Sequence, residues 1–276
     1  MGLAVFLVAA AMAVAGGIGV IAFHEPIRSV LSLVVVMIAL SILFLLLSAQ
    51  FVFVVQIIVY AGAVMVLFLF VIALLGPARE LGRGRLRFQP WLAALFAVVF
   101  LALTWMMLQG VQYRQPEKAD LHVFGTVQWI AVELFTKYLY PFELTSLLLL
   151  VAAIGAILSQ QAEHRRSMSV MSIGGSQLDS SWFLLLGAVL FTLGAIGVMV
   201  RRNPLVILIC IELMLNAVNL TLITFARQLQ NPEGQLFALM VMTVAAAEAV
   251  VGLAILVEIF RVRDAEDVDD LSELKG

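Results

Sequence analysis

The sequence predicts an all-α fold: a polytopic membrane helix bundle with about eight transmembrane helices, five in a first part and three in a second. Of the 276 residues, 63% are hydrophobic and 12% are charged, whereas a soluble domain carries about 25% charged residues. Apolar stretches recur at the length of about 20 residues that a helix needs to cross a hydrocarbon layer of about 30 Å. Two acidic residues nevertheless stand inside such stretches, which predicts a function that needs carboxyl groups in the membrane.

The first part contains five predicted spans, at 2–23, 29–48, 52–75, 91–109 and 142–160. The first span is Ala-rich like a secretory signal, but it lacks a positive n-region and runs on to Phe23, so we interpret it as a retained helix. No charged residue occurs between Ser29 and Ala78, and the weak polar pair Ser48 and Gln50 indicates a tight helical hairpin. Residues 76–90 form a basic loop bounded by prolines.

The longest loop, residues 110–140, contains a predicted short amphipathic helix at 121–137. Trp129 suits the headgroup region of a membrane, and a further span at this place is an alternative. Pro141 is predicted to open the next helix, with Glu143 in its first turn. Since the helix dipole favours an acid there, Glu143 is either a helix-start residue or a proton-handling group.

The second part follows a polar, small-residue linker at 161–181 and contains three predicted spans, at 182–200, 204–226 and 236–260. The predicted domains are a five-helix membrane domain, a linker, a three-helix membrane domain and a charged cytoplasmic tail, at 1–166, 167–181, 182–260 and 261–276 respectively.

Two acids in the second part are the main candidate site residues. Glu212 lies in the middle of its span, and Asn216 and Asn219 follow at i+4 and i+7, so the three share one face of the helix. We expect the asparagines to orient Glu212 or a water. Glu248 stands in the next span, in the setting Ala-Ala-Ala-Glu-Ala-Val-Val-Gly. Such acids can serve as steps for protons, or they can be neutral groups that only fix helix packing.

Composition excludes most other chemistry. The single cysteine, Cys210, rules out a disulfide within the chain and a four-thiolate iron–sulfur site. The three histidines fall near span ends or in loops, which argues against a buried bis-histidine haem. We therefore predict no catalytic, cofactor-binding or metal site in this chain, and no basic tract indicates nucleic acid. No lysine lies in any predicted span, so a Glu–Lys proton relay would need its lysine from another subunit.

The charges predict a topology conflict between the two parts. With five spans, Arg28, the arginines of the 79–87 loop and those at 165–166 fall on one side, which the positive-inside rule makes cytoplasmic. The arginines of the second part, Arg201, Arg202, Arg261 and Arg263, also favour the cytoplasm. A linker that leaves the first part on the cytoplasmic side would instead place Arg201 and Arg202 outside. Three resolutions are open: two separate polypeptides, with Met168 or Met171 as a second start; a crossing at 121–137; or an inverted second part.

The motifs resemble two subunits of one known complex. Residues 181–276 are similar to the three-span subunit K of bacterial NADH-quinone oxidoreductase (respiratory complex I). The similarity runs through Arg201-Arg202-Asn203, the run 211–220 (Ile-Glu-Leu-Met-Leu-Asn-Ala-Val-Asn-Leu), Ala-Ala-Ala-Glu-Ala at 245–249 and the acidic tail at 268–274. Residues 1–166 resemble subunit J, through Gln-Ile-Ile-Val-Tyr-Ala-Gly-Ala-Val-Met-Val-Leu-Phe at 56–68 and the segments 134–136 and 140–144. Subunits J and K are normally separate chains.

The resemblance implies a role in proton translocation. It assigns Glu212 and Glu248 to a proton path between the quinone-side channel and the antiporter-like subunits, which would be partners together with membrane lipid. It implies a π-bulge that can convert to α-helix and act as a gate, made by Tyr60, Gly62, Ala63, Val64 and Met65, with Gln56 on the same face. It puts Arg201 and Arg202 in a short cytoplasmic loop, where they are otherwise ordinary topology anchors. It also implies the bacterial cytoplasmic (inner) membrane as location, and NAD, FMN, iron–sulfur clusters and quinone in partner subunits.

Two other classes of function remain open. Subunit K also resembles small components of multisubunit cation/proton antiporters, so a transporter module is one alternative. A purely structural assembly subunit is the other. The similarity of the first part to subunit J and the acidic tail favour the respiratory complex.

Overall fold

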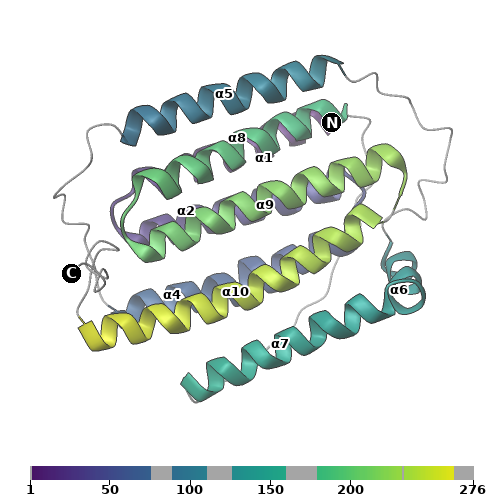
Figure 1. Cartoon of the computed structure of the whole chain (residues 1–276). Coiled ribbons are helices and arrows are strands. Elements are labelled where there is room, and N and C mark those ends of the chain that lie inside the picture. Colours follow the sequence, from purple (N-terminus) through teal and green to yellow (C-terminus); the bar gives the residue numbers. More distant parts are fainter. Residues whose placement is uncertain (1, 76–88, 111–125, 160–178, 232, 264–276) are drawn as a thin grey trace.

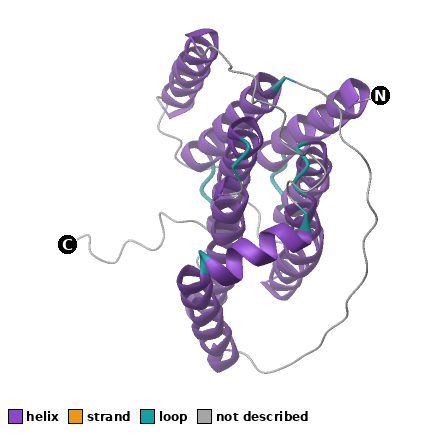
Figure 2. Ribbon diagram, turned by 90° about the vertical axis from the view of Figure 1, so that its right-hand side faces the viewer, coloured by secondary structure: helices purple, strands orange, loops and turns teal. Residues whose placement is uncertain are grey.

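The computed structural model describes residues 2–75, 89–110, 126–159, 179–231 and 233–263. Within these ranges the regular secondary structure is entirely helical (Figure 2). The elements, in chain order, are α1 (Gly2–Ala22), α2 (Pro26–Leu46), α3 (Gln50–Val55), the π-helix η1 (Gln56–Val64), α4 (Met65–Leu75), α5 (Gln89–Gly110), α6 (Val127–Thr136), α7 (Leu139–Ser159), α8 (Ser180–Val200), α9 (Pro204–Leu229) and α10 (Glu233–Arg263).

Seven helices in the described residues are long and apolar enough to cross a membrane. The pair α6 and α7 supplies an eighth candidate, bent by 94° at its break. The prediction of an all-α bundle with about eight spans is therefore confirmed. The third span is one continuous rod made of α3, η1 and α4, because the π-helix interrupts it without ending it.

The long helices lie roughly parallel to one another (Figure 1). Helix α5 lies along one edge of the bundle and packs on α8, and α7 lies along the opposite edge and packs on α10. Between these edges, α1 and α2 of the first part (α1–α7) pack against α8 and α9 of the second part (α8–α10). One hydrophobic core runs through both parts.

Two glycines allow α8 and α9 to approach closely. A Cβ atom on Gly194 would lie 2.5 Å from Met214 Cγ and 2.8 Å from the Cys210 carbonyl oxygen. A Cβ on Gly197 would collide with the same cysteine side chain. Small residues at helix contacts are typical of membrane bundles, where van der Waals packing replaces the hydrophobic driving force.

Helix α6 is short and strongly turned relative to α7. Its 10 residues span about 15 Å, half of what a crossing needs. Since α6 is turned by 94° from α7, it lies across the end of the bundle (Figure 2). A helix is thus present from Val127 onward, whereas its place at the interface and the alternative of a crossing both stay predictions; 121–125 lie outside the described residues.

Helix α7 begins two residues before the predicted start. It starts at Leu139, so Pro141 is its third residue and Glu143 lies beyond its first turn. The expectation that Pro141 opens the helix with Glu143 in the first turn is wrong. Proline is still tolerated there, because the first four N–H groups of a helix have no partner within it.

The helix directions define two ends of the bundle. Arg201, at the end of α8, donates to the carbonyl oxygens of Ile21 (3.2 Å) and Phe23 (2.8 Å), at the end of α1. We call this the inner end, and the opposite one the outer end. Helix α9 starts at the inner end directly after Arg201, and Arg227 in its last turn donates to the Leu46 carbonyl at the outer end of α2.

The outer end also joins the two parts through charged side chains. Lys137 Nζ, in the turn between α6 and α7, lies 2.6 Å from Glu233 Oε1, at the start of α10. The hydrogen bond to Glu233 raises the pKa of Lys137. Because both helices begin at this contact, α7 and α10 run in parallel, and both end at the inner end. The predicted linker at 167–181 and tail at 261–276 fall mainly outside the described residues, so those domain limits remain predictions.

Candidate functional site

Glu212 is the buried acid at the centre of the candidate site. Its side chain is 3% exposed, and Asn216 and Asn219 on the same face of α9 are fully buried. The depth of Glu212 follows from the start of α9. There the Asn203 side chain accepts from the N–H groups of Leu205 (2.9 Å) and Val206 (3.3 Å) as an N-cap. Nine residues further on, at about 1.5 Å each, Glu212 lies near the middle of a 30 Å layer.

A chain of hydrogen bonds links Glu212 to the first part. Asn216 Nδ2 donates to the Glu212 backbone carbonyl at 2.9 Å and lies 3.4 Å from its carboxyl Oε1. The Oδ1 atom of Asn216 accepts from Gln56 Nε2 at 3.0 Å. Gln56 is the first residue of the π-helix, and its Nε2 also lies 2.9 Å from the sulfur of Met37. The carboxyl group is therefore connected, through two amides, to the π-helix.

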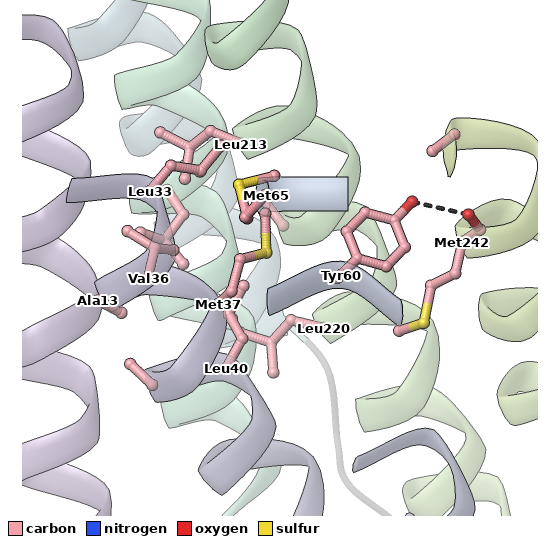
Figure 3. Close-up of a cluster of buried hydrophobic side chains, with 14 of the residues drawn as sticks. Ala13, Leu33, Val36, Met37, Leu40, Tyr60, Met65, Leu213, Leu220 and Met242 are labelled. Atoms are coloured by element: carbon pink, nitrogen blue, oxygen red, sulfur yellow. Dashed lines mark hydrogen bonds between the residues drawn. The ribbon is translucent and has the colours of Figure 1, made fainter. Parts of the chain in front are cut away.

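Tyr60 makes a second connection between the π-helix and the second part. It is fully buried, and its hydroxyl donates to the Met242 carbonyl oxygen on α10 at 2.8 Å (Figure 3). The same hydroxyl interacts with the Glu212 carboxyl group. A phenol hydroxyl can both donate and accept a hydrogen bond, so Tyr60 can contact Met242 and Glu212 together. Gln56 and Tyr60 thus flank the acid from one face of the π-helix.

Glu248 lies on α10 with its side chain exposed on the surface of the bundle. Helix α10 packs on α9, which carries Glu212. Glu212 and Glu248 therefore lie on neighbouring helices; Glu212 is enclosed by this chain, and Glu248 is open to whatever packs against α10. An acid at such a place in a membrane needs a polar or protein neighbour.

The other predicted site residues are placed as follows. Glu143 is exposed on α7, away from the side chains that flank Glu212. In the π-helix, Gly62 is half-buried, Ala63 is exposed and Val64 is buried, while the buried Met65 is the first residue of α4. Arg201 is buried against the end of α1, and its neighbour Arg202 is half-buried. The roles assigned to all these residues remain predictions.

Some buried polar atoms lack a partner in the described chain. Near Glu212 they include Gln56 Oε1 and both amide atoms of Asn219. Buried groups of this kind are commonly satisfied by ordered water. No cluster of three or more His, Cys, Asp or Glu side chains that could hold a metal ion occurs in the part of the chain that the structure describes. The arrangement is suited to holding and passing a proton.

Comparison with known proteins gives the same division into two parts. Residues 16–158 match the family of NADH-ubiquinone/plastoquinone oxidoreductase chain 6, and residues 182–276 match the family of NADH-ubiquinone/plastoquinone oxidoreductase chain 4L. The chain belongs to both families. The chain 6 match covers α2 to α7 with the π-helix, and the chain 4L match covers α8 to α10 with Glu212 and Glu248. The predicted resemblance to the J and K subunits, and the multi-pass membrane character, are confirmed.

Curated relatives of the chain 4L family are similar at the level of individual residues. "NADH-quinone oxidoreductase subunit K 1" of Geotalea daltonii is 54% identical over 93 residues, which are 34% of this chain and 93% of that protein. "NADH-quinone oxidoreductase subunit K 2" of Geotalea uraniireducens shows the same identity and coverage. "NADH-quinone oxidoreductase subunit K" of Thermomicrobium roseum is 55% identical over 100 residues, 36% of this chain and 98% of that protein.

The polar network crosses the boundary between the two families. Gln56 and Tyr60 lie in the chain 6 region, whereas Glu212, Asn216 and Met242 lie in the chain 4L region. The contacts between them were not predicted from the sequence, because nothing in an apolar helix marks which neighbour it faces. Arg227 was also missed. Its one available signal is that it is the only basic residue of α9 and stands in the last turn.

Proposed function

We propose that this chain carries part of the proton path through the membrane arm of a proton-translocating NADH-quinone oxidoreductase. The observation that carries the proposal is the enclosure of Glu212 at mid-span by hydrogen-bonding groups from both families. A carboxyl group there is costly to bury, at about 2.5–3.5 kcal/mol for a charged acid. Its surroundings offer the Tyr60 hydroxyl and the Asn216 amide as hydrogen-bonding partners.

Glu248 continues the path toward a neighbouring subunit. It lies on α10, which packs on the helix that carries Glu212, yet it opens onto the surface of α10. An antiporter-like subunit that packs on this face would cover Glu248, and the quinone-side channel would lie on the opposite side of Glu212. Glu143, exposed on α7, is a further candidate station on the path.

The π-helix provides the candidate gate. Gln56 and Tyr60 both sit on it and both reach the second part. Conversion of the segment 56–64 to regular α-helix would change the hydrogen-bond register from i+5 to i+4 and turn these two side chains relative to each other. Contact between Tyr60 and Glu212 would then be broken and re-formed with the state of the helix.

The remaining chemistry of the complex belongs to partners. NAD, FMN, the iron–sulfur clusters and quinone would bind in other subunits, and this chain would reside in the bacterial inner membrane as a multi-pass component. Within this chain, the contribution is confined to holding and moving protons.

The test is removal of each acid without change of shape. Glu212→Gln and Glu248→Gln keep the side-chain volume and abolish protonation chemistry. We expect the complex to assemble, as seen by native gel, while proton translocation in everted membrane vesicles falls by about tenfold, equivalent to about 1.4 kcal/mol on the barrier.

Glu258→Gln is the matched control, because Glu258 is an exposed acid on the same helix as Glu248. It should leave proton translocation unchanged. Full translocation in both single variants and in the double variant Glu212→Gln/Glu248→Gln would refute the proposal.

A further inference from the structure

The amide of Gln56 contacts two other helices at once. Its Nε2 atom lies 3.0 Å from Asn216 Oδ1 on α9 and 2.9 Å from the sulfur of Met37 on α2. Gln56 is also the first residue of the π-helix. A primary amide nitrogen carries two hydrogens, so each of these contacts can use one of them. The side chain thus joins the π-helix to α2 and to α9 at one point.

The orientation of both amides is set from the backbone of α9. Asn216 Nδ2 donates at 2.9 Å to the Glu212 carbonyl oxygen, which can only accept, so Asn216 Oδ1 is the atom that faces Gln56. That oxygen and the Met37 sulfur are both acceptors. If Gln56 turned its amide over, Oε1 would face two acceptors and both contacts would be lost. The two neighbours therefore favour a single orientation of Gln56.

Met37 belongs to the hydrophobic core, yet it supplies the second of these acceptors. It is fully buried in the middle of α2, among the apolar side chains of the core (Figure 3). A leucine would fill a similar volume at this place. A thioether differs from leucine in its polarizable sulfur, which accepts a hydrogen bond weakly. The contact of the sulfur with Gln56 is therefore the feature of Met37 that packing alone does not explain.

Gln56 Oε1 is the atom that this arrangement leaves open. It is buried and has no hydrogen-bond partner within the described residues. Since both hydrogens of Nε2 have acceptors, Oε1 is kept at a fixed place, one amide away from the Glu212 carboxyl group. Buried acceptors of this kind are commonly satisfied by ordered water. The orientation of Gln56 thus decides where such a water can be held.

We propose that Met37 is a positioning residue of the proton path. Its sulfur accepts the second amide hydrogen of Gln56 and so holds the start of the π-helix in contact with Asn216. A sulfur acceptor fixes the orientation of the amide but releases it more readily than an oxygen would, which suits a segment that changes between two helical forms. The link to proton transfer rests on the proposed function of Glu212, whereas the orientation of Gln56 does not.

Two substitutions separate hydrogen bonding from packing. Met37→Leu keeps the volume and removes the acceptor, whereas Met37→Gln supplies an acceptor oxygen on a side chain of similar length. In the assembled complex, we expect Met37→Leu to lower proton translocation about threefold, the effect of one weak hydrogen bond, and Met37→Gln to retain most of it. A residue that only fills the core gives the reverse order, because burying a polar group costs more than a volume-conserving apolar change. That reverse order would overturn the inference.

The coupling between Gln56 and Asn216 gives a readout that does not depend on proton transfer. It is the departure from additivity of Gln56→Leu and Asn216→Leu in the apparent melting temperature of the solubilised complex. We expect this departure to fall at least about twofold in the Met37→Leu background and to be unchanged in the Met12→Leu background. Met12 is the matched control, because it packs against the same core from α1.

Different outcomes overturn the role of Met37 and the role of Glu212. Undiminished coupling in the Met37→Leu background would overturn the role of Met37, even where Glu212→Gln abolishes proton translocation. Full translocation in Glu212→Gln would instead remove the proposed function. The effect of Met37 on the Gln56 amide would then still be read from the coupling alone.

Discussion

Asn216 connects the acid of the second part to the π-helix of the first. Its amide donates to Glu212 on one side and accepts from Gln56 on the other. Neither neighbour can exchange these hydrogen bonds for bonds to bulk water, because Gln56, Glu212 and Asn216 are all buried. A side chain that uses both ends of its amide in this way fixes the distance between the two parts as well as the orientation of Glu212.

A double-mutant cycle tests the Gln56–Asn216 contact. Asn216→Leu or Gln56→Leu alone leaves a buried amide without its partner, which costs about 1–3 kcal/mol. The double variant removes both amides, so its loss should be smaller than the sum of the two single losses. The measurement is the apparent melting temperature of the detergent-solubilised protein.

Thr192→Val serves as the control for this cycle. Thr192 is also buried, but its hydroxyl donates to the Ala188 carbonyl of its own helix. Its removal leaves no orphaned partner across an interface and should change the melting temperature little. Additive losses for Gln56→Leu and Asn216→Leu would show that the contact does not join the two side chains.

At the scale of the element, the π-helix brings Gln56, Tyr60 and Val64 to the buried side of the third span. Gly62 has a particular place in it. A Cβ at this position would lie 3.3 Å from the carbonyl oxygen of Ile57, five residues earlier. That carbonyl is the acceptor position of an i+5 hydrogen bond, so a larger side chain at residue 62 crowds the π form and not the α form.

Gly62→Ala should therefore move the segment toward regular α-helix. A cost on the order of 1 kcal/mol changes such an equilibrium about fivefold. We expect a lower number of protons translocated per quinone reduced, and altered hydrogen exchange confined to residues 56–64. Gly252→Ala is the control, since its Cβ would make only an ordinary 3.4 Å contact with Leu208. Equal effects of both substitutions would mean that general helix stiffening, and not the π form, is responsible.

The sequence predicted the spans well, because length and hydropathy alone decide whether a segment can cross a membrane. The first and last residues of the spans were predicted less accurately where capping residues determine the helix boundary. Helix α2 begins at Pro26 and not at residue 29, since proline is favoured in the first turn. The partners of Glu212 in the first part could not be predicted. In a membrane bundle the lipid-facing and helix-facing residues are both apolar, so hydropathy does not show which helices are neighbours.

At the scale of the whole molecule, two arginines of the second part hold carbonyl groups at helix ends of the first. Arg201 donates to carbonyls at the end of α1, and Arg227 donates to a carbonyl at the end of α2. The last carbonyls of a helix lack partners within it, and a cation there is favoured by the helix dipole. The two contacts stand at the two ends of α9, about 35 Å apart along its axis. Together they fix the position of one part relative to the other along the helix axes. This also aligns Glu212 with the π-helix.

Arg201→Met and Arg227→Met test this alignment. Each substitution keeps an apolar stem but leaves buried or partly buried carbonyls without a donor, so we expect each to destabilise the bundle by about 1–3 kcal/mol. Because the sites are far apart, the losses should add in the double variant. The apparent melting temperature of the solubilised protein measures the effect, with Arg28→Met as control, since Arg28 pairs only with the exposed Glu25 of its own part. If Arg28→Met lowered the melting temperature as much as Arg201→Met, the arginines would act through net charge and not through the joints between the parts.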